Sequence, residues 1–295
     1  MSTSEALPYL QLLTPLTFTS HVAPLPSNDP DAPLLQQHTI TAFSTSPRGL
    51  FSARLEMTVN TKTMAIADLS VPKLDPAAEA ELRPFIDRIV GKGDCGDDGR
   101  AVLPSSGLYH NVSVLTWAMG EWLSVAVRRA RAWWALEREV GEKEGLRALV
   151  RRLRAGKQGS GKRRGARQRR DSDEDESEGE EEEEGQEREE GKCGKADLLR
   201  FMGRTCIDLE VPVLDDAEGK VSGLRVQWRI VFDWTGEARS EVGVLIGLPG
   251  KWHKHDERGQ LSGLPKLFDE LVQGGEDPLD AVRTIVCLMA GEQKS

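Results

Sequence analysis

Cysteine is scarce in this chain of 295 residues: it occurs at Cys95, Cys193, Cys206 and Cys287, and no two form a Cys-x-x-Cys pair. Such spacing excludes a disulfide framework and is typical of proteins from a reducing compartment. Long apolar runs are also lacking, because no stretch approaches the roughly 18 apolar residues of a membrane span. Residues 1–16 have neither a basic start nor a continuous apolar core, so we predict no signal peptide. A soluble, intracellular protein is the expectation.

Catalytic motifs are missing as well. The chain has no Gly-x-Ser-x-Gly turn, no phosphate-binding glycine loop and no His-Glu-x-x-His helix. Acidic residues do occur in the amphipathic stretches, and we assign them to solvated helix faces: Glu79, Glu81, Asp87, Asp269 and Glu270. We therefore expect no catalytic residue, no cofactor and no metal site, and a protein that is not an enzyme.

What the chain does contain is charge, in two adjoining runs. Residues 151–170 carry ten Lys and Arg and no acidic residue, and residues 171–190 carry fourteen acidic residues against the single Arg188. Neither run has enough apolar side chains to offset the entropy lost on ordering. A disordered linker, basic and then acidic, is predicted over residues 146–194.

The basic run supports three interpretations. Its clustered charge resembles a nuclear localisation signal that an import receptor reads in extended form. The residues that carry this resemblance are Lys162, Arg163, Arg164, Arg167, Arg169 and Arg170. Direct binding of nucleic-acid phosphates is a weaker hypothesis, because the acidic run competes for the same arginines. A solvated linker with neither role is the third.

The acidic run has two interpretations of equal weight. It suits histones or other basic partners, or it is a spacer that keeps the flanking regions apart and soluble. Ser172 and Ser177 each precede an acidic residue by three positions, which is the pattern that acidophilic kinases prefer. Phosphorylation of these two serines would increase the negative charge of the run.

The first half predicts strands and then helices. Residues 16–22 suit an edge strand, and residues 38–43, 51–59 and 64–71 have the β-branched content or period-two alternation of an antiparallel meander. Asp75 and Pro76 then suit the start of a helix to about residue 89, with Pro84 delaying or bending it. Asn111 caps a long helix that ends near Val140.

The second half repeats this order. A short helix is predicted over residues 195–202, followed by strands over 206–213, 224–232 and 242–248. Two helices close the chain, with apolar stripes in residues 264–271 and 278–289.

The fold class predicted from this order is α+β. It comprises two small domains, each an antiparallel β-meander followed by two packed helices, separated by the disordered charged linker. The boundaries are an irregular N-terminal segment over 1–36, an N-terminal domain over 37–145, the linker over 146–194 and a C-terminal domain over 195–292.

Trp133 and Trp134 are adjacent in the long helix and point to different sides of it, so at least one should be partly exposed. An exposed aromatic beside arginines is a common interface anchor. Tertiary packing is the alternative role for both residues.

The order of elements resembles that of RWD-like domains, which are small α+β interaction modules found in tandem in some inner-kinetochore proteins. The stretches that carry the resemblance are Phe51–Pro72 with the helices to Val140, and Leu224–Pro249 with the helices to Met289. The resemblance implies a non-enzymatic scaffold that binds partner proteins through its sheets and long helices.

These observations together predict a nuclear scaffold for protein–protein interaction, at chromatin or the kinetochore, whose partners are other nuclear subunits and an import receptor. One alternative is a factor that binds histones or nucleic acid through the charged linker. The other is an enzyme whose site is built from unremarkable polar residues.

Overall fold

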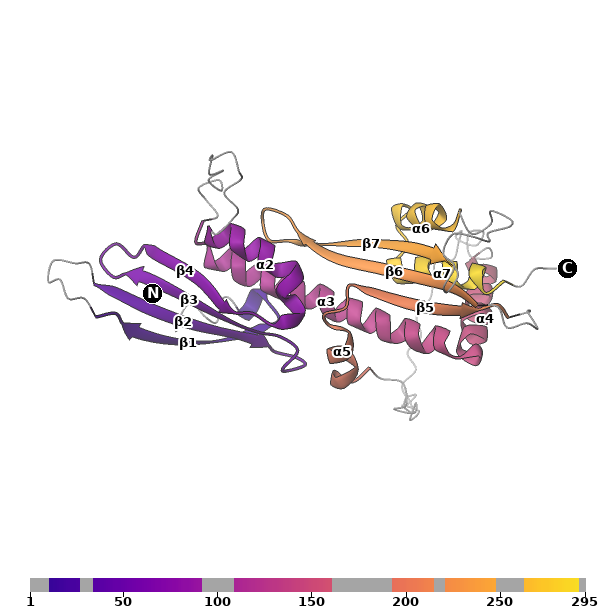
Figure 1. The fold of residues 1–295 in the computed structure, drawn as a ribbon, viewed down its shortest axis with the longest axis horizontal. Coiled ribbons are helices and arrows are strands. Elements are labelled where there is room, and N and C mark those ends of the chain that lie inside the picture. The colour runs from indigo at the N-terminus through magenta and orange to yellow at the C-terminus, as the bar shows by residue number, and fades with distance from the viewer. Residues whose placement is uncertain are drawn as a thin grey trace, which may run out of the picture. The chain divides into compact units, whose positions relative to one another are not determined.

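A computed structural model describes residues 11–26, 34–91, 109–160, 193–214, 221–247 and 263–291 of the chain (Figure 1). Its strands are β1 (Leu16–Pro24), β2 (Leu35–Ser44), β3 (Ser52–Asn60), β4 (Ile66–Lys73), β5 (Cys206–Pro212), β6 (Val221–Phe232) and β7 (Ala238–Gly247). Its helices are α2 (Pro76–Val90), α3 (Val112–Gly141), α4 (Lys143–Ser160), α5 (Lys195–Phe201), α6 (Leu264–Gln273) and α7 (Pro278–Met289). The prediction of a mixed α and β protein with antiparallel sheets is confirmed.

The chain forms two compact units, and each takes segments from before and after residues 161–192. The first unit consists of Met1–Ala135, Lys195–Asp208 and Arg225–Leu245. The second consists of Leu136–Gly194, Leu209–Leu224 and Ile246–Ser295.

The four-stranded sheet of the first unit is a simple meander in the order β1-β2-β3-β4 (Figure 1). Its strands alternate, so that one face is apolar and buried. Phe18 lies opposite Ala42, and Ala42 opposite Ala53, all three with 4% exposure or less. This buried face, together with α2 and α3, forms the core of the unit, and the rings of Phe51 and Trp122 lie 5.7 Å apart there.

Helix α2 begins where the sequence indicates. The Asp75 side chain accepts a hydrogen bond from the Ala77 amide at 3.0 Å, and Pro76 occupies the first turn. Pro84 neither delays the helix nor ends it, contrary to one expectation. It has no N–H, so the carbonyl of Ala80 lacks its α-helical partner. Pro84 is tolerated because both it and Ala80 are exposed.

Helix α3 starts after the predicted cap, since the Asn111 side chain accepts from the Val114 amide at 3.0 Å. Its apolar stripe continues past Trp122 and includes Arg129, which is fully buried.

The second sheet has the order β5-β6-β7. On its surface Arg225 and Asp208 form a two-pronged ion pair with N–O distances of 2.6 and 2.8 Å. The hydrogen bonds from Arg225 hold the pKa of Asp208 below its ordinary value.

The structure differs from the sequence prediction over residues 146–160, where it shows helix α4 in place of disordered chain. The physical reason is an apolar stripe within the basic sequence: Leu146, Leu149 and Val150 are all buried, so this part of the run has a core to join. Elsewhere in the second unit, the Arg283 guanidinium donates two hydrogen bonds of 2.8 Å to the carboxylate of Glu139.

Candidate functional site

A buried polar network occupies the centre of the first unit. The Glu81 carboxylate, on α2, accepts four hydrogen bonds. Two come from Arg129, at 2.7 and 2.9 Å, one from the Trp122 indole at 3.0 Å and one from the Ile230 amide at 3.0 Å. The predicted position of Glu81 on a solvated face is therefore wrong, because its side chain is 8% exposed.

Arg129 is the other half of the network. Its guanidinium is completely buried, and besides Glu81 it donates to the Trp228 carbonyl at 2.9 Å and the Met202 carbonyl at 3.1 Å. Only its Nε lacks a partner. The charges of Glu81 and Arg129 thus compensate each other, and the pair joins helices α2 and α3 to the segments around Met202 and Trp228. Because both groups are committed to these bonds, we assign the pair a structural role.

One signal in the sequence points to Arg129. It follows Trp122 by seven residues, which places the two on the same face of the helix. A charged residue on a buried stripe requires an opposite charge nearby. The identity of the partner, 48 residues away, has no local signal.

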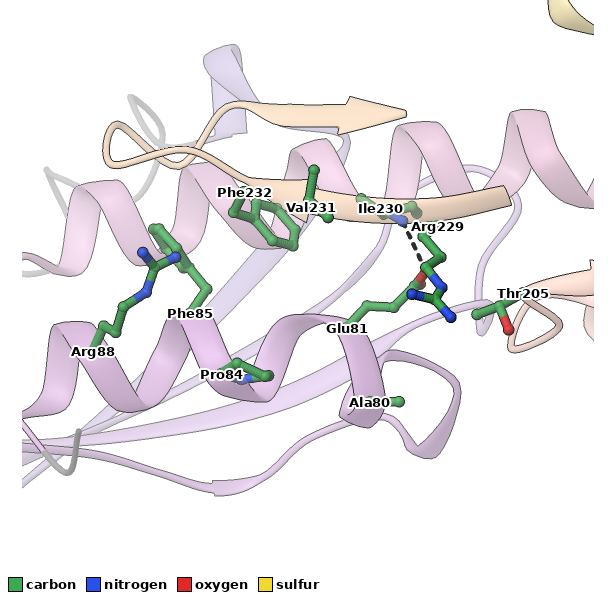
Figure 2. Close-up of a pocket in the computed structure, with 10 residues that line it drawn as sticks. All are labelled: Ala80, Glu81, Pro84, Phe85, Arg88, Thr205, Arg229, Ile230, Val231 and Phe232. Atoms are coloured by element: carbon green, nitrogen blue, oxygen red, sulfur yellow. Dashed lines mark hydrogen bonds between the residues drawn. The ribbon is translucent and has the colours of Figure 1, made fainter. Parts of the chain in front are cut away.

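Beside this network, a groove of about 520 Å³ lies between α2 and the end of β6 (Figure 2). The Phe85 and Phe232 rings form its apolar end, with centroids 5.3 Å apart. The guanidinium of Arg88 lies over the Phe85 ring at 5.2 Å. Pro84 and Arg229 also line the groove, and Arg88 and Arg229 are both exposed. The groove is therefore an apolar channel with two arginines at its surface.

The groove exists because β5 and β6 stop pairing before β6 ends. The Trp228 amide donates to the Thr205 carbonyl at 2.8 Å, at the start of β5. Residues 229–232 of β6 extend past that point, and on this edge the Glu81 side chain replaces a strand by accepting from the Ile230 amide (Figure 2). Beside the end of β6, the Glu81 side chain and the groove therefore take the place of a neighbouring strand.

The turn that joins β6 to β7 holds an exposed tryptophan. Asp233 accepts from the amides of Thr235 and Glu237 at 2.8 and 3.1 Å and from the Thr235 hydroxyl at 2.6 Å. These hydrogen bonds, the Thr235 hydroxyl first, lower the pKa of the Asp233 carboxyl. Trp234 lies between Asp233 and Thr235 in this hydrogen-bonded turn, and its side chain is 71% exposed.

The two tryptophans proposed as interface candidates have different surroundings. Trp133 is 1% exposed, its indole donates to the Arg204 carbonyl at 3.0 Å, and its ring meets Trp228 edge to face at 6.0 Å. Trp134 is half-buried. The localisation residues Lys162, Arg163, Arg164, Arg167, Arg169 and Arg170, and the candidate phosphoacceptors Ser172 and Ser177, lie outside the described residues.

No cluster of three or more His, Cys, Asp or Glu side chains with the geometry to hold a metal ion occurs among the described residues. No helix in the described ranges is both long enough and apolar enough to cross a membrane.

No protein-family model matches this chain, and no curated protein matches it in sequence.

Proposed function

We propose that this protein is a non-enzymatic nuclear scaffold that binds other proteins, at chromatin or the kinetochore. In the finer architecture of this proposal, two halves of meander and packed helices flank a disordered charged linker. The element order supports it, because β1–β4 precede α2 and α3, and β5–β7 precede α6 and α7.

The observation that carries the proposal is Trp234. The Trp234 side chain is 71% exposed. A partner that covers it removes a large aromatic surface from water, which favours binding. The hydrogen bonds of Asp233 hold its turn in one conformation, so little backbone entropy is lost on binding. Tryptophan is one of the residue types enriched among those that dominate protein–protein affinity.

The charged linker has a separate role in the proposal. Its basic residues 162–170 provide nuclear import, and phosphorylation of Ser172 and Ser177 adjusts the charge of its acidic run. The alternative function places partner binding in the linker itself, with histones or nucleic acid as the ligands.

Affinity purification of the tagged full-length chain from nuclear extract, followed by mass spectrometry, tests the scaffold. We expect a defined set of nuclear subunits that stays bound at about 0.3 M salt, where exposed charge pairs are screened. Trp234→Ala should release most of that set. Met64→Ala is the matched control, because Met64 is also 71% exposed.

Deletion of residues 161–190, which leaves helix α4 whole, with import restored by a foreign signal, separates the two functions. A scaffold keeps its partners after this deletion. Loss of all partners, or recovery of only histones and nucleic acid that 0.3 M salt releases, would contradict the scaffold and support the linker-driven function.

A further inference from the structure

We propose that the groove between α2 and β6 binds an extended acidic segment of a partner protein, which adds to the free edge of β6 as a short strand. This inference rests on the proposed function, since it assigns a partner chemistry to the scaffold. It adds to the role of Trp234 a second binding site, the groove, which would recognise a partner through main-chain hydrogen bonds and charge.

The edge of β6 supports this proposal. In an antiparallel strand, alternate residues direct both main-chain groups to the same side. Trp228 and Ile230 direct their amides away from β7, to Thr205 and to Glu81. The Ile230 carbonyl and the Phe232 amide follow on that side. Among the described strands, β5 is the one that pairs with this edge. Because β5 begins only at Cys206, it does not extend as far as the Ile230 carbonyl and the Phe232 amide.

The opposite wall supplies a further main-chain group. Pro84 leaves the carbonyl of Ala80 without an α-helical donor, and both residues line the groove. A segment that enters the groove therefore meets the Ile230 carbonyl and the Phe232 amide on the strand and an acceptor on the helix. An extended peptide satisfies such groups with its own backbone, as in strand addition to a sheet edge.

The charge of the groove determines which peptide fits. Glu81 is compensated by Arg129 and adds no net charge to the groove. Arg88 and Arg229 are exposed, and neither forms an ion pair with any residue that the structure describes. Two uncompensated arginines at the surface of an apolar groove favour a segment that alternates carboxylates with apolar side chains.

The size and walls of the groove suit the apolar part of such a segment. A volume of about 520 Å³ falls in the range of about 300–1,000 Å³ that is usual for binding pockets. Phe85 and Phe232 provide aromatic surface at one end (Figure 2). The apolar side chains of the segment would lie against these rings, with its carboxylates toward Arg88 and Arg229.

The test uses the full-length chain and a short fluorescein-labelled peptide in which Leu and Phe alternate with Asp and Glu. Binding is followed by fluorescence anisotropy, with a second peptide that has Lys and Arg in place of the acids as the comparison. We expect the acidic peptide to bind and the basic peptide not to bind. The charge-reversed variant R88E/R229E should weaken it by about tenfold or more.

The variant R48E/R131E is the matched control, because it changes the net charge equally at two exposed arginines away from the groove. It should leave the affinity unchanged. Hydrogen exchange gives a backbone readout: the acidic peptide should slow exchange at the Phe232 amide more than at the Val231 amide, which faces β7.

Several outcomes overturn the proposal. They are equal binding of both peptides, no effect of R88E/R229E, and unchanged exchange at Phe232. Binding that appears only after deletion of residues 171–190 would show that the chain's own acidic run, not a partner, occupies the groove. Failure of the scaffold is distinguishable: if R88E/R229E keeps the nuclear partners that W234A loses, the groove assignment fails and the scaffold stands.

Discussion

Glu81 and Arg129 form a two-pronged ion pair in the interior of the first unit, in which each carboxylate oxygen accepts from one terminal guanidinium nitrogen, at 2.7 and 2.9 Å. The arginine is fully buried and the glutamate is 8% exposed. Each charge is tolerated because the other lies against it, and because four further polar groups complete their hydrogen bonding.

Removal of one partner should be severely destabilising. Arg129→Met leaves the Glu81 carboxylate buried without a counter-charge, and we expect the free energy of unfolding to fall by about 3–5 kcal/mol. Urea denaturation followed by circular dichroism measures the change.

The double variant Glu81→Leu with Arg129→Met tests whether the pair also stabilises the fold by satisfying neighbouring polar groups. Apolar replacement of a simple buried ion pair is often harmless. Here it leaves polar groups without partners, namely the Ile230 amide, the Trp122 indole and the carbonyls of Met202 and Trp228. We expect the double variant to remain less stable than the wild type by more than about 2 kcal/mol. Wild-type stability in this variant would mean that these groups find other partners.

Gly236 should not tolerate a side chain. Its φ of +87° lies in the left-handed region, and an added Cβ would lie 3.2 Å from the Val114 carbonyl oxygen and 3.3 Å from the Phe85 ring. We expect Gly236→Ala to reduce the free energy of unfolding by about 1–2 kcal/mol. Gly243→Ala is the control, because nothing lies within 4 Å of its added Cβ. Equal effects of the two substitutions would contradict the close packing of the β6–β7 turn.

His38 should make stability depend on pH. Burial lowers the pKa of this side chain below its ordinary value of 6.5. Between the folded and unfolded pKa values the unfolded chain binds the proton and the folded chain does not. Stability is therefore complete above about pH 6.5 and decreases as the pH falls through the folded pKa. Urea midpoints between pH 7.5 and 5 should show this loss, and His38→Gln should reduce the slope of stability against pH.

The adjacent tryptophans should differ in their contribution to stability. Trp133→Ala removes a side chain that is 1% exposed, and we expect a loss of about 3–5 kcal/mol in the free energy of unfolding. Trp134→Ala, at a half-buried position, should cost less. Thermal unfolding compares the two variants, and an equal loss would conflict with the packing of Trp133 against Trp228.

Local pattern accounted for most of the elements. Alternation in residues 51–59 predicted β3, and the caps at Asp75 and Asn111 predicted the starts of α2 and α3. These signals act within a few residues, so one sequence is sufficient to find them. Helix α4 was missed because its few apolar residues, among them Leu146 and Leu149, stand among basic ones and gain stability only from tertiary contact.

The candidate site was beyond the reach of local pattern. Its groove depends on where β5 stops pairing with β6 and on the Glu81 carboxylate reaching the Ile230 amide, 149 residues along the chain. Trp234 could be placed at a turn from the sequence, but its exposure depends on how that turn is braced. Contacts between distant segments leave no periodicity in the sequence, so the groove and its arginines required the structure.

The network also constrains the order of events during synthesis. Arg129 emerges from the ribosome 99 residues before Trp228, whose carbonyl it requires. At the usual rate of about 5–20 residues per second, this interval lasts about 5–20 s. Throughout that time the N-terminal sheet and its helices are present, while the surface that β6 will cover is open to water. The nascent chain therefore exposes this apolar surface until the last strands have been synthesised.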